Sequence, residues 1–478
     1  MRAYQDVSLA PARRAKALLE EMTLAEKVGQ LNQRLYGFRI YERKCVNGED
    51  TIELSEEFRQ EVEKYSGLGV LYGLYRADPW ADKDYETGLT GVLSKKAYNQ
   101  VQRYVLEHSR LGIPVMMSSE CPHGHQALDG YLLPVNLLAG ATFDPAMVRA
   151  AYRVSGRQLQ NMGVDFALMS MLDVLRDPRW GRSEECYSED PYLSARMAEA
   201  AVTGMQESGP EVVAKHFAAQ GEGTGGVNAS AARIGERELR EIHFPPAAAA
   251  IKAGAKGIMA AYNEIDGVYC HANRWLLNDV IRKEMGFDGI VMSDGVAIDQ
   301  LDSMTGDNVV SGALALQSGV DVGLWDEAFG KLEEAVRRGL VKEAQIDQAV
   351  LRVLTLKFER GLFEHPYLEE EGEIHVDYAQ NPESVQLARE GLVILQNKNQ
   401  VLPFWENQAS GKKIAVVGPN ADDLYNQLGD YTPPLRRDDG ITVLDGMKLI
   451  FKESDIRFSQ GCYLRKRDEN LLKEAVDT

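Results

Sequence analysis

Several short apolar runs of this 478-residue chain end in side chains that could carry chemistry. Asp294 follows the run GIVMS, and Glu120 follows PVMMSS. The pair Lys215 and His216 follows VVA, and Tyr262 follows GIMAA. A carboxylate beside an apolar strand costs free energy unless something compensates it. Asp294 could therefore be a helix cap, a structural ion-pair partner or a chemically reactive group.

Each of these residues also has a purely structural interpretation. Asp294 stands in SDG, which is ordinary turn chemistry. Lys215 and His216 interrupt an apolar strand, so we expect both to be buried, and a buried lysine needs an acidic or hydroxyl partner. The loop at 176–191, which contains Arg182, could form structural ion pairs. Its mixture of arginine and aromatic residues also suits sugar binding.

Two further stretches could hold a metal ion or a phosphate group. The segment ECPHGHQ brings Glu120, His123 and His125 close in sequence, but zinc sites need a further, separately spaced ligand. The glycine-rich stretch GEGTGGVNAS at 221–230 lacks the Lys-Ser/Thr pair of a phosphate-binding loop. We therefore predict no metal and no cofactor, and we interpret 221–230 as a mobile loop at the rim of a site.

The elements that must position these residues are strands alternating with helices, from about residue 65 to 360. The strand-like runs lie at 112–120, 164–172, 211–217, 255–263, 289–294 and 320–324. Near-continuous apolar strands separated by helices are typical of a parallel sheet covered on both faces. The pattern predicts a (β/α)8-like barrel, with a doubly wound open sheet as the alternative. In a barrel, polar residues after several strands would share one pocket.

The region after the strand–helix alternation predicts a second domain. We assign 1–362 to the barrel and 363–384, which is acidic and contains two prolines, to a linker. Residues 385–478 would then begin an α/β domain, because KKIAVVGPNADDL reads as a strand followed by a turn. This second domain is expected to be short, since only about 95 residues remain for it.

The composition excludes several function classes. Lys and Arg number 53 and Asp and Glu 72, which gives a net charge of −19. This balance argues against nucleic acid and against anionic membranes as partners. No run approaches the roughly 18 apolar residues of a membrane span, no signal-peptide core is visible, and the five cysteines form no CxxC pair. We expect a cytoplasmic enzyme that acts on a neutral or cationic small substrate. The sequence leaves open whether the protein forms a homo-oligomer.

Taken in order, the motifs resemble glycoside hydrolase family 3. The resemblance covers nearly the whole chain, and several motifs are long. The matching pieces are ECPHGHQAL, LLPVNLLAGATFDP, DPRWGRSEECYSEDPYL, VVAKHFA, GERELREIHFPP, MAAYNEIDG, NDVIRKEMGFDGIVMSD, LPFWEN and KKIAVVGPNAD. The resemblance implies a (β/α)8-like TIM barrel followed by an α/β sandwich domain, which is incomplete in this chain.

The resemblance also implies a retaining exo-β-glycosidase that hydrolyses terminal non-reducing β-D-glucosyl residues, so its partner would be a small carbohydrate. In such enzymes one carboxylate attacks the anomeric carbon and a second group protonates the leaving oxygen. The family nucleophile is the aspartate of the SD motif, which falls on Asp294. The positions that match the family's substrate-binding residues are Glu120, Arg182, Lys215, His216 and Tyr262.

Two positions depart from the family pattern. Many relatives carry tryptophan directly after the nucleophile, where this chain has Gly295. A missing aromatic side chain should loosen the leaving-group subsite, so we expect tolerance of diverse aglycones. Glu120 stands where many glucosidases have aspartate, and its extra methylene would crowd a sugar's hydroxymethyl group. Because β-xylosides lack that group and one methylene decides about 1–3 kcal/mol, a β-xylosidase is the alternative.

The acid/base of two-domain relatives is a glutamate in the later part of the sandwich domain. Glu453, Glu469 and Glu474 do not stand in a matching context, and KHFAAQGE lacks the Asp-Ser/Thr-His of the N-acetylglucosaminidase branch. We therefore expect the acid/base to lie beyond Thr478. If it is truly absent, the alternative is a non-catalytic carbohydrate-binding protein.

Overall fold

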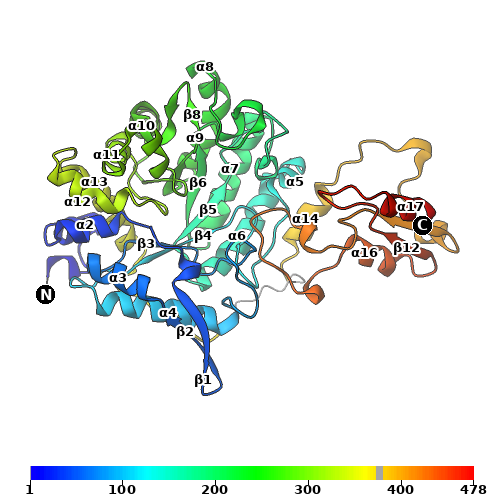
Figure 1. Cartoon of the computed structure of the whole chain (residues 1–478), viewed down its shortest axis with the longest axis horizontal. Coiled ribbons are helices and arrows are strands. Elements are labelled where there is room, and N and C mark those ends of the chain that lie inside the picture. The colour runs from blue at the N-terminus through cyan, green and yellow to red at the C-terminus, as the bar shows by residue number, and fades with distance from the viewer. Residues whose placement is uncertain (1, 373–379) are drawn as a thin grey trace. The chain divides into compact units, whose positions relative to one another are not determined.

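The computed structural model describes residues 2–372 and 380–478. The chain forms two compact units, which we call the barrel unit, Met1–Gly391, and the C-terminal unit, Leu392–Thr478 (Figure 1). Each unit is described by itself.

The boundary between the units lies later than the sequence-based division at 385. Residues 385–391 belong to the barrel unit, because helix α14 (Glu383–Glu390) packs against α5 (Asn136–Ala141) and α6 (Pro145–Asn161). Leu387 of α14 is buried in the barrel core. Residues 373–379 of the predicted linker lie outside the described residues.

The centre of the barrel unit is a parallel sheet of six strands in the order β10-β7-β6-β5-β4-β3. Its strands are β3 (Val70–Tyr72), β4 (Met116–Glu120), β5 (Phe166–Ser170), β6 (Glu211–Phe217), β7 (Gly257–Ala260) and β10 (Ile290–Met292). Every residue of β4 and β5 is buried, as expected for strands covered on both faces. The runs predicted at 112–120, 164–172, 211–217, 255–263 and 289–294 each contain a strand, whereas the run at 320–324 forms only an isolated bridge at Val322. Strand β3 had not been recognised, because its run is only three residues long.

Two further segments close this sheet into a barrel. Met292 of β10 forms a parallel bridge with Val322, and Tyr72 of β3 forms one with Tyr36. The two added segments then bond to each other, because Gly323 N–H donates to Leu31 O at 3.0 Å and Trp325 N–H donates to Gln33 O at 2.9 Å. The predicted (β/α)8-like barrel is confirmed, and the open doubly wound sheet is excluded.

Helices surround the strands, as Figure 1 shows. Consecutive helices pack on one another, for example α6 on α7 and α7 on α9. The helices of this layer are α1 (Pro11–Leu19), α2 (Leu24–Gln30), α3 (Glu56–Tyr65), α4 (Gly91–Glu107), α6, α7 (Pro191–Gln206), α9 (Phe244–Lys252), η8 (Trp275–Glu284), α11 (Asn308–Ser318), α12 (Leu332–Arg337) and α13 (Glu343–Glu359). Their apolar faces and the strands form one core.

The N-termini of two helices are determined by their local sequence. In α6 and α7 an aspartate precedes a proline, Asp144-Pro145 and Asp190-Pro191. Each aspartate accepts a hydrogen bond from a backbone N–H of the first turn, and proline fits the first helical position because no N–H is needed there. These caps fix the first residues of α6 and α7.

Two antiparallel hairpins stand outside the barrel. One pairs β1 (Tyr41–Val46) with β2 (Glu49–Leu54), and the other pairs β8 (Glu264–Ile265) with β9 (Val268–Tyr269). The second hairpin follows β7, so it carries the chain from Asn263 to His271 beside the carboxyl ends of the strands.

The C-terminal unit contains a parallel pair of strands, β11 (Lys413–Val417) and β12 (Asp455–Ser459). Helix α16 (Val443–Ile450) lies between them in sequence, and α17 (Glu469–Asp477) follows β12. This is the strand–helix–strand arrangement of an α/β domain, and the strand predicted in KKIAVV is confirmed.

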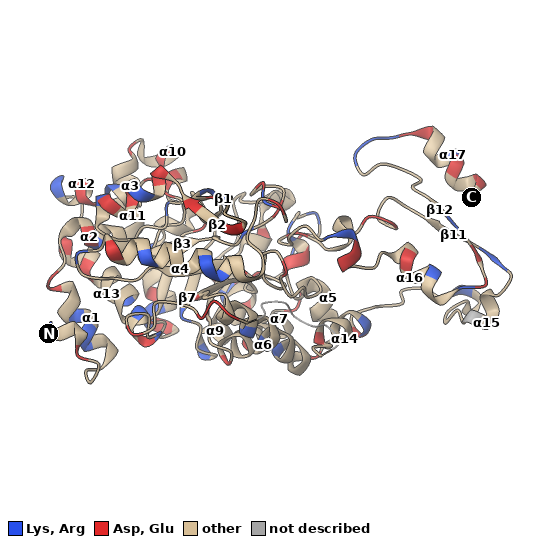
Figure 2. Cartoon of the chain, turned by 90° about the horizontal axis from the view of Figure 1, so that it is seen from below, with Lys and Arg blue, Asp and Glu red and all other residues tan. Residues whose placement is uncertain are grey.

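Acidic and basic residues are interspersed over the helices of both units (Figure 2). Among the described residues, no helix is long and apolar enough to cross a membrane.

A buried lysine joins the amino-terminal end of the barrel. Lys357 of α13 is 0% exposed, and its ammonium donates to Gln30 Oε1 at 2.6 Å, to Pro114 O at 2.7 Å and to Leu68 O at 3.4 Å. Helix α13 is thereby tied to α2 and to the segments that lead into β3 and β4. Burial lowers the pKa of Lys357 to about 7, against the charge of Asp165, which acts to raise it.

This shift predicts a pH-dependent stability. The lysine pKa is about 7 in the folded protein and about 10.4 in the unfolded chain. Between these values the unfolded chain binds more protons, so the free energy of unfolding should rise by about 2 kcal/mol from pH 7 to pH 9. In Lys357→Met this rise should vanish, whereas the exposed control Lys252→Met should keep it. Urea denaturation at several pH values checks this, and an unchanged slope in Lys357→Met would contradict it.

Candidate active site

The carboxyl ends of β4 and β6 are joined by a buried ion pair. The Lys215 ammonium donates to Glu120 Oε2 at 2.7 Å, and the two side chains are 2% and 7% exposed. The Tyr72 hydroxyl, at the end of β3, donates to Glu120 Oε1 at 3.0 Å. The burial of Lys215 against an acidic partner follows the expectation from the sequence, because an uncompensated buried charge is costly.

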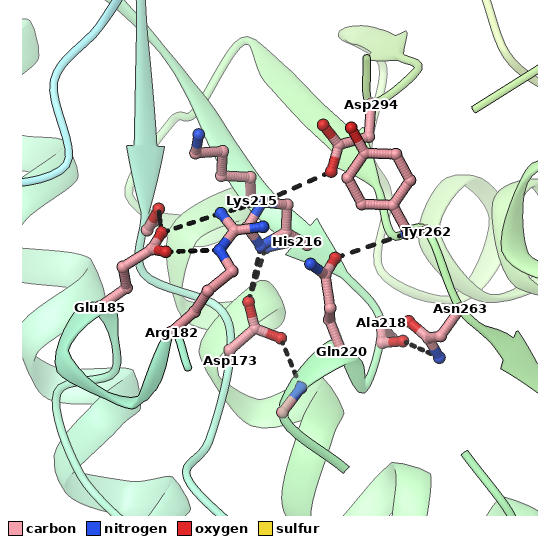
Figure 3. A network of polar contacts seen from close by, with 12 residues as sticks. Asp173, Arg182, Glu185, Lys215, His216, Ala218, Gln220, Tyr262, Asn263 and Asp294 are labelled. Atoms are coloured by element: carbon pink, nitrogen blue, oxygen red, sulfur yellow. Dashed lines mark hydrogen bonds and ion pairs between the residues drawn. The ribbon is translucent and has the colours of Figure 1, made fainter. Parts of the chain in front are cut away.

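His216 occupies the centre of the cluster (Figure 3). Lys215 and His216 are consecutive, yet both reach neighbours in the cluster, and the pairing of β6 with β7 is irregular between Ala214 and Phe217. Such bulges redirect side chains and are common beside active sites. The irregular pairing accounts for two adjacent functional side chains on one strand.

The hydrogen bonds of His216 define its protonation. Nδ1 lies 2.8 Å from Asp173 Oδ2, and Nε2 lies 3.1 Å from Arg182 Nη2. A carboxylate accepts and a guanidinium donates, so Nδ1 carries the proton and Nε2 accepts. His216 is therefore a neutral imidazole whose Nε2 also lies 3.6 Å from Asp294 Oδ2.

Arg182 is held by Glu185. Its Nη2 donates to Glu185 Oε2 at 3.0 Å, and the Ser170 hydroxyl, at the end of β5, donates to the same carboxylate. Burial acts to raise the pKa of Glu185, but the positive charges of Arg182 and Lys215 outweigh it and hold that pKa well below its usual range. The ionised Glu185 fixes the guanidinium in the cluster.

Asp294 follows β10 and presents one oxygen to the cluster. Its Oδ1 accepts the N–H of Gly295 at 2.8 Å, and its own backbone N–H donates to His271 Nε2 at 3.1 Å. Burial lowers the pKa of His271 to about 4, so this imidazole is neutral at pH 7 and can accept. Asp294 Oδ2 is buried and has no hydrogen-bond donor among the described residues. The carboxylate is thus fixed through its backbone and Oδ1 while Oδ2 is available to react.

Tyr262 supports the residue after Asp294. Its hydroxyl donates to Gly295 O at 2.8 Å, and its backbone N–H donates to Gln220 Oε1 at 3.4 Å. Figure 3 shows its ring beside the Asp294 carboxylate. Asn263, the next residue, donates to Ala218 O at 3.3 Å and helps to hold the β6 end.

The structure brings together the residues that the sequence singled out, and their roles stay predictions. Glu120, Arg182, Lys215, His216, Tyr262 and Asp294 lie in one connected region at the carboxyl ends of the strands. The sequence analysis missed Asp173, Glu185, His271 and Tyr72. Asp173 could have been found, because it directly follows the predicted strand at 164–172. Tyr72 and His271 act through contacts between segments far apart in sequence, whereas Glu185 pairs with Arg182 only three residues away.

The histidines of ECPHGHQ do not gather around Glu120 as metal ligands. His125 Nε2 lies 2.8 Å from Ser119 Oγ, and Glu120 is engaged by Lys215 and Tyr72. The described residues contain no group of three or more His, Cys, Asp or Glu placed to hold a metal ion.

The Lys215–Glu120 pair predicts an asymmetry in stability. Lys215→Met leaves Glu120 buried and without its cation, so the free energy of unfolding should fall by roughly 3–5 kcal/mol. The double variant Lys215→Met/Glu120→Gln should regain part of that loss, because the uncompensated charge is gone. Lys283→Met breaks the exposed pair of Lys283 with Asp279 and should change stability by less than about 1 kcal/mol. Urea denaturation compares the variants; equal losses for Lys215→Met and Lys283→Met would rule the asymmetry out.

Known proteins are similar to this chain in sequence. The family model described as "Glycosyl hydrolase family 3 N terminal domain" matches residues 23–356. A beta-xylosidase of Formosa agariphila is 31% identical over 440 residues, which cover 84% of this chain and 60% of that protein. A periplasmic beta-glucosidase of Salmonella typhimurium is 31% identical over 491 residues, covering 96% of this chain and 58% of that protein.

Solved structures of beta-glucosidases are also similar to this chain. A b-glucosidase from Erythrobacter marinus superposes with a TM-score of 0.86 at 31% identity, covering 100% of this chain and 64% of that one. A beta-glucosidase from Listeria innocua in complex with glucose gives 0.81 at 29% identity, covering 97% and 62%. The chain spans about 55–60% of the length of the first curated relatives. With its barrel matched over residues 23–356, the chain belongs to glycoside hydrolase family 3.

Proposed function

We propose that this chain supplies the sugar-binding site and the nucleophile of a retaining, exo-acting β-glycosidase for terminal non-reducing β-D-glucosyl residues. The observation that carries the proposal is Asp294 Oδ2, a buried carboxylate oxygen with no donor among the described residues, 3.6 Å from the neutral His216. An oxygen without competing hydrogen bonds keeps its lone pairs available for attack on carbon. The names of the similar proteins, beta-glucosidase and beta-xylosidase, fit the same substrate class.

The reaction would proceed by double displacement. Asp294 Oδ2 forms a bond to the anomeric carbon as the bond from that carbon to the leaving oxygen breaks, and the leaving oxygen takes a proton from an acid. Water then attacks the anomeric carbon, releasing the carboxylate and giving its proton back to the conjugate base. Two inversions return the β configuration.

The surrounding charges would bind and orient the sugar. Lys215 and Arg182 are buried or half-buried cations whose N–H groups suit hydroxyl oxygens, and Glu120 can accept from hydroxyl groups. His216 is locked by Asp173, so its ring orientation does not depend on the substrate.

The acid/base is proposed to come from outside residues 1–478. The carboxylates of the cluster other than Asp294 already serve as acceptors: Glu120 for Lys215, Asp173 for His216 and Glu185 for Arg182. None of these three is poised to donate a proton. In a retaining enzyme the acid/base carboxyl stands about 5–5.5 Å from the nucleophile.

Trapping the covalent intermediate tests the proposal. A 2-deoxy-2-fluoro-β-glucoside with a good leaving group, which needs no acid for the first step, should label the wild-type chain on the peptide that contains Asp294. Asp294→Asn should not be labelled. Asp288→Asn, which changes an exposed carboxylate six residues earlier, should be labelled like wild type. Mass spectrometry of the digested protein gives the readout.

Two outcomes would overturn the proposed mechanism. A label on another residue would reassign the nucleophile. A protein that binds glucose but is never labelled would instead be a carbohydrate-binding protein, which is the alternative raised by the missing acid/base.

A β-xyloside is the second candidate substrate. The observation that favours it is that both carboxylate oxygens of Glu120 accept hydrogen bonds, one from Lys215 and one from Tyr72. These contacts hold the Glu120 side chain in a position where it would crowd a hydroxymethyl group. Several similar proteins are named beta-xylosidase.

Shortening Glu120 tests this choice. Glu120→Asp should raise the ratio of kcat/KM for an aryl β-glucoside over the matching β-xyloside by about tenfold or more, because one methylene of space is restored. The matched control Glu359→Asp, which shortens an exposed glutamate of α13, should leave the ratio unchanged. If Glu120→Asp lowers kcat/KM equally for the β-glucoside and the β-xyloside, Glu120 does not select between these substrates.

A further inference from the structure

Aromatic side chains gather at one part of the barrel mouth, next to the charged cluster. The Trp325 ring stacks on Tyr36 at 4.7 Å with an interplanar angle of 26° and meets Tyr72 edge-to-face at 4.9 Å. Trp80, which is 48% exposed, lies 5.3 Å from Trp325. We call Tyr36, Tyr72, Trp80 and Trp325 the aromatic wall. It borders the charged cluster through Tyr72, whose hydroxyl bonds Glu120.

The position of Trp325 is set by the closure of the barrel. Its N–H donates to Gln33 O at 2.9 Å, and Val296 N–H donates to Leu324 O at 2.8 Å. The loop that follows residues 320–324 is thereby bonded to the loop that carries Asp294. Trp325 (φ 63°) and Val296 (φ 61°) both adopt the left-handed conformation that is uncommon for such residues. Residues held in sparsely populated conformations often cluster at functional sites.

Trp325 and any side chain at position 295 exclude each other. A Cβ added to Gly295 would lie 2.5 Å from Cε3 and 2.6 Å from Cζ3 of Trp325, and 3.2 Å from the Tyr262 hydroxyl oxygen. Gly295 is not among the glycines with positive φ, so space rather than backbone conformation requires glycine there. The volume beside the nucleophile is already filled by an indole that arrives from the other loop.

The indole also presents an unsatisfied donor. Trp325 Nε1 is buried and has no hydrogen-bond acceptor among the described residues. A buried N–H without an acceptor is costly, and a substrate oxygen would satisfy it. A half-buried aromatic face and an unused donor beside a carboxylate are the features of a sugar-binding subsite, because such sites combine aromatic surface with a few placed polar groups.

We propose that Trp325 is the specificity-determining aromatic platform of the leaving-group subsite, in the place that a residue following Asp294 would otherwise fill. This inference rests on the proposed β-glycosidase function. It reverses the expectation drawn from Gly295 alone: the subsite is not open, and leaving groups with a flat or ring-shaped face that can stack on the indole should be preferred over small alkyl groups.

The kinetic test compares leaving groups in the Trp325 variants. With the acid/base that the proposed function places outside residues 1–478 present in the assay, Trp325→Ala should lower kcat/KM for an aryl β-glucoside and for a β-linked glucose disaccharide by about tenfold or more. It should lower kcat/KM for methyl β-glucoside by less than about threefold. Trp325→Phe keeps a ring but lacks the N–H, so it should recover most of the loss for the aryl substrate and less for the disaccharide. Equal effects on all three substrates would overturn the inference.

A binding test does not depend on turnover. Isothermal titration calorimetry measures the Kd of a non-hydrolysable S-linked β-disaccharide. This Kd should be at least about tenfold higher for Trp325→Ala than for the wild type, whereas the Kd for glucose should be nearly the same for both proteins. Equal disaccharide binding by wild type and Trp325→Ala overturns this inference while leaving the proposed function standing. If the wild-type chain neither binds nor hydrolyses any β-glycoside, the proposed function fails, and this inference fails with it.

The steric exclusion has its own test. Gly295→Ala should lower the melting temperature by about 2 °C or more in the wild-type background, because the added Cβ overlaps the indole. In the Trp325→Ala background the same change should be nearly neutral. An equal penalty in both backgrounds would show that Trp325 does not fill the space beside Gly295, and would overturn the inference.

Discussion

The structure of this site depends on the mutual compensation of buried charges at the carboxyl ends of the barrel strands. Lys215 pairs with Glu120, Arg182 with Glu185 and the neutral His216 with Asp173. Each of these groups would be costly alone in the interior, so each fixes the position of its partner. Asp294 is the exception, because its Oδ2 is buried without a donor among the described residues.

The barrel geometry gives this cluster two unlike sides. β4, β5, β6, β10 and the loops after them contribute charged side chains, whereas the closing segments, β3 and the loop after β3 contribute the aromatic wall. Sugars carry hydroxyl groups at their edges and apolar C–H groups on their faces, so a mouth with one charged arc and one aromatic arc matches both. Closure of the barrel by Gly323 and Trp325 is what brings the two arcs together. The active-site proposal and the Trp325 inference thus share one structural origin.

Much of the site was predictable because barrel strands end at a common edge. Asp294, Glu120 and Lys215 were found from their places after apolar runs, and the structure brings them together. Tyr72, Glu185 and His271 were not found, since nothing in their local sequence distinguishes them from ordinary core or loop residues. β3 was missed for a related reason: three apolar residues are too few to show a period.

The sequence by itself determined the barrel, the strand-end residues and the family, because periodic burial and residue order along the chain are local properties. Only the tertiary structure decided the partner of each charge, the tautomer of His216 and the meaning of Gly295. From the sequence, Gly295 reads as a missing aromatic group; in the folded chain, Trp325, thirty residues later, fills that space. Contacts between distant segments are set by how the barrel closes, and no local pattern encodes them.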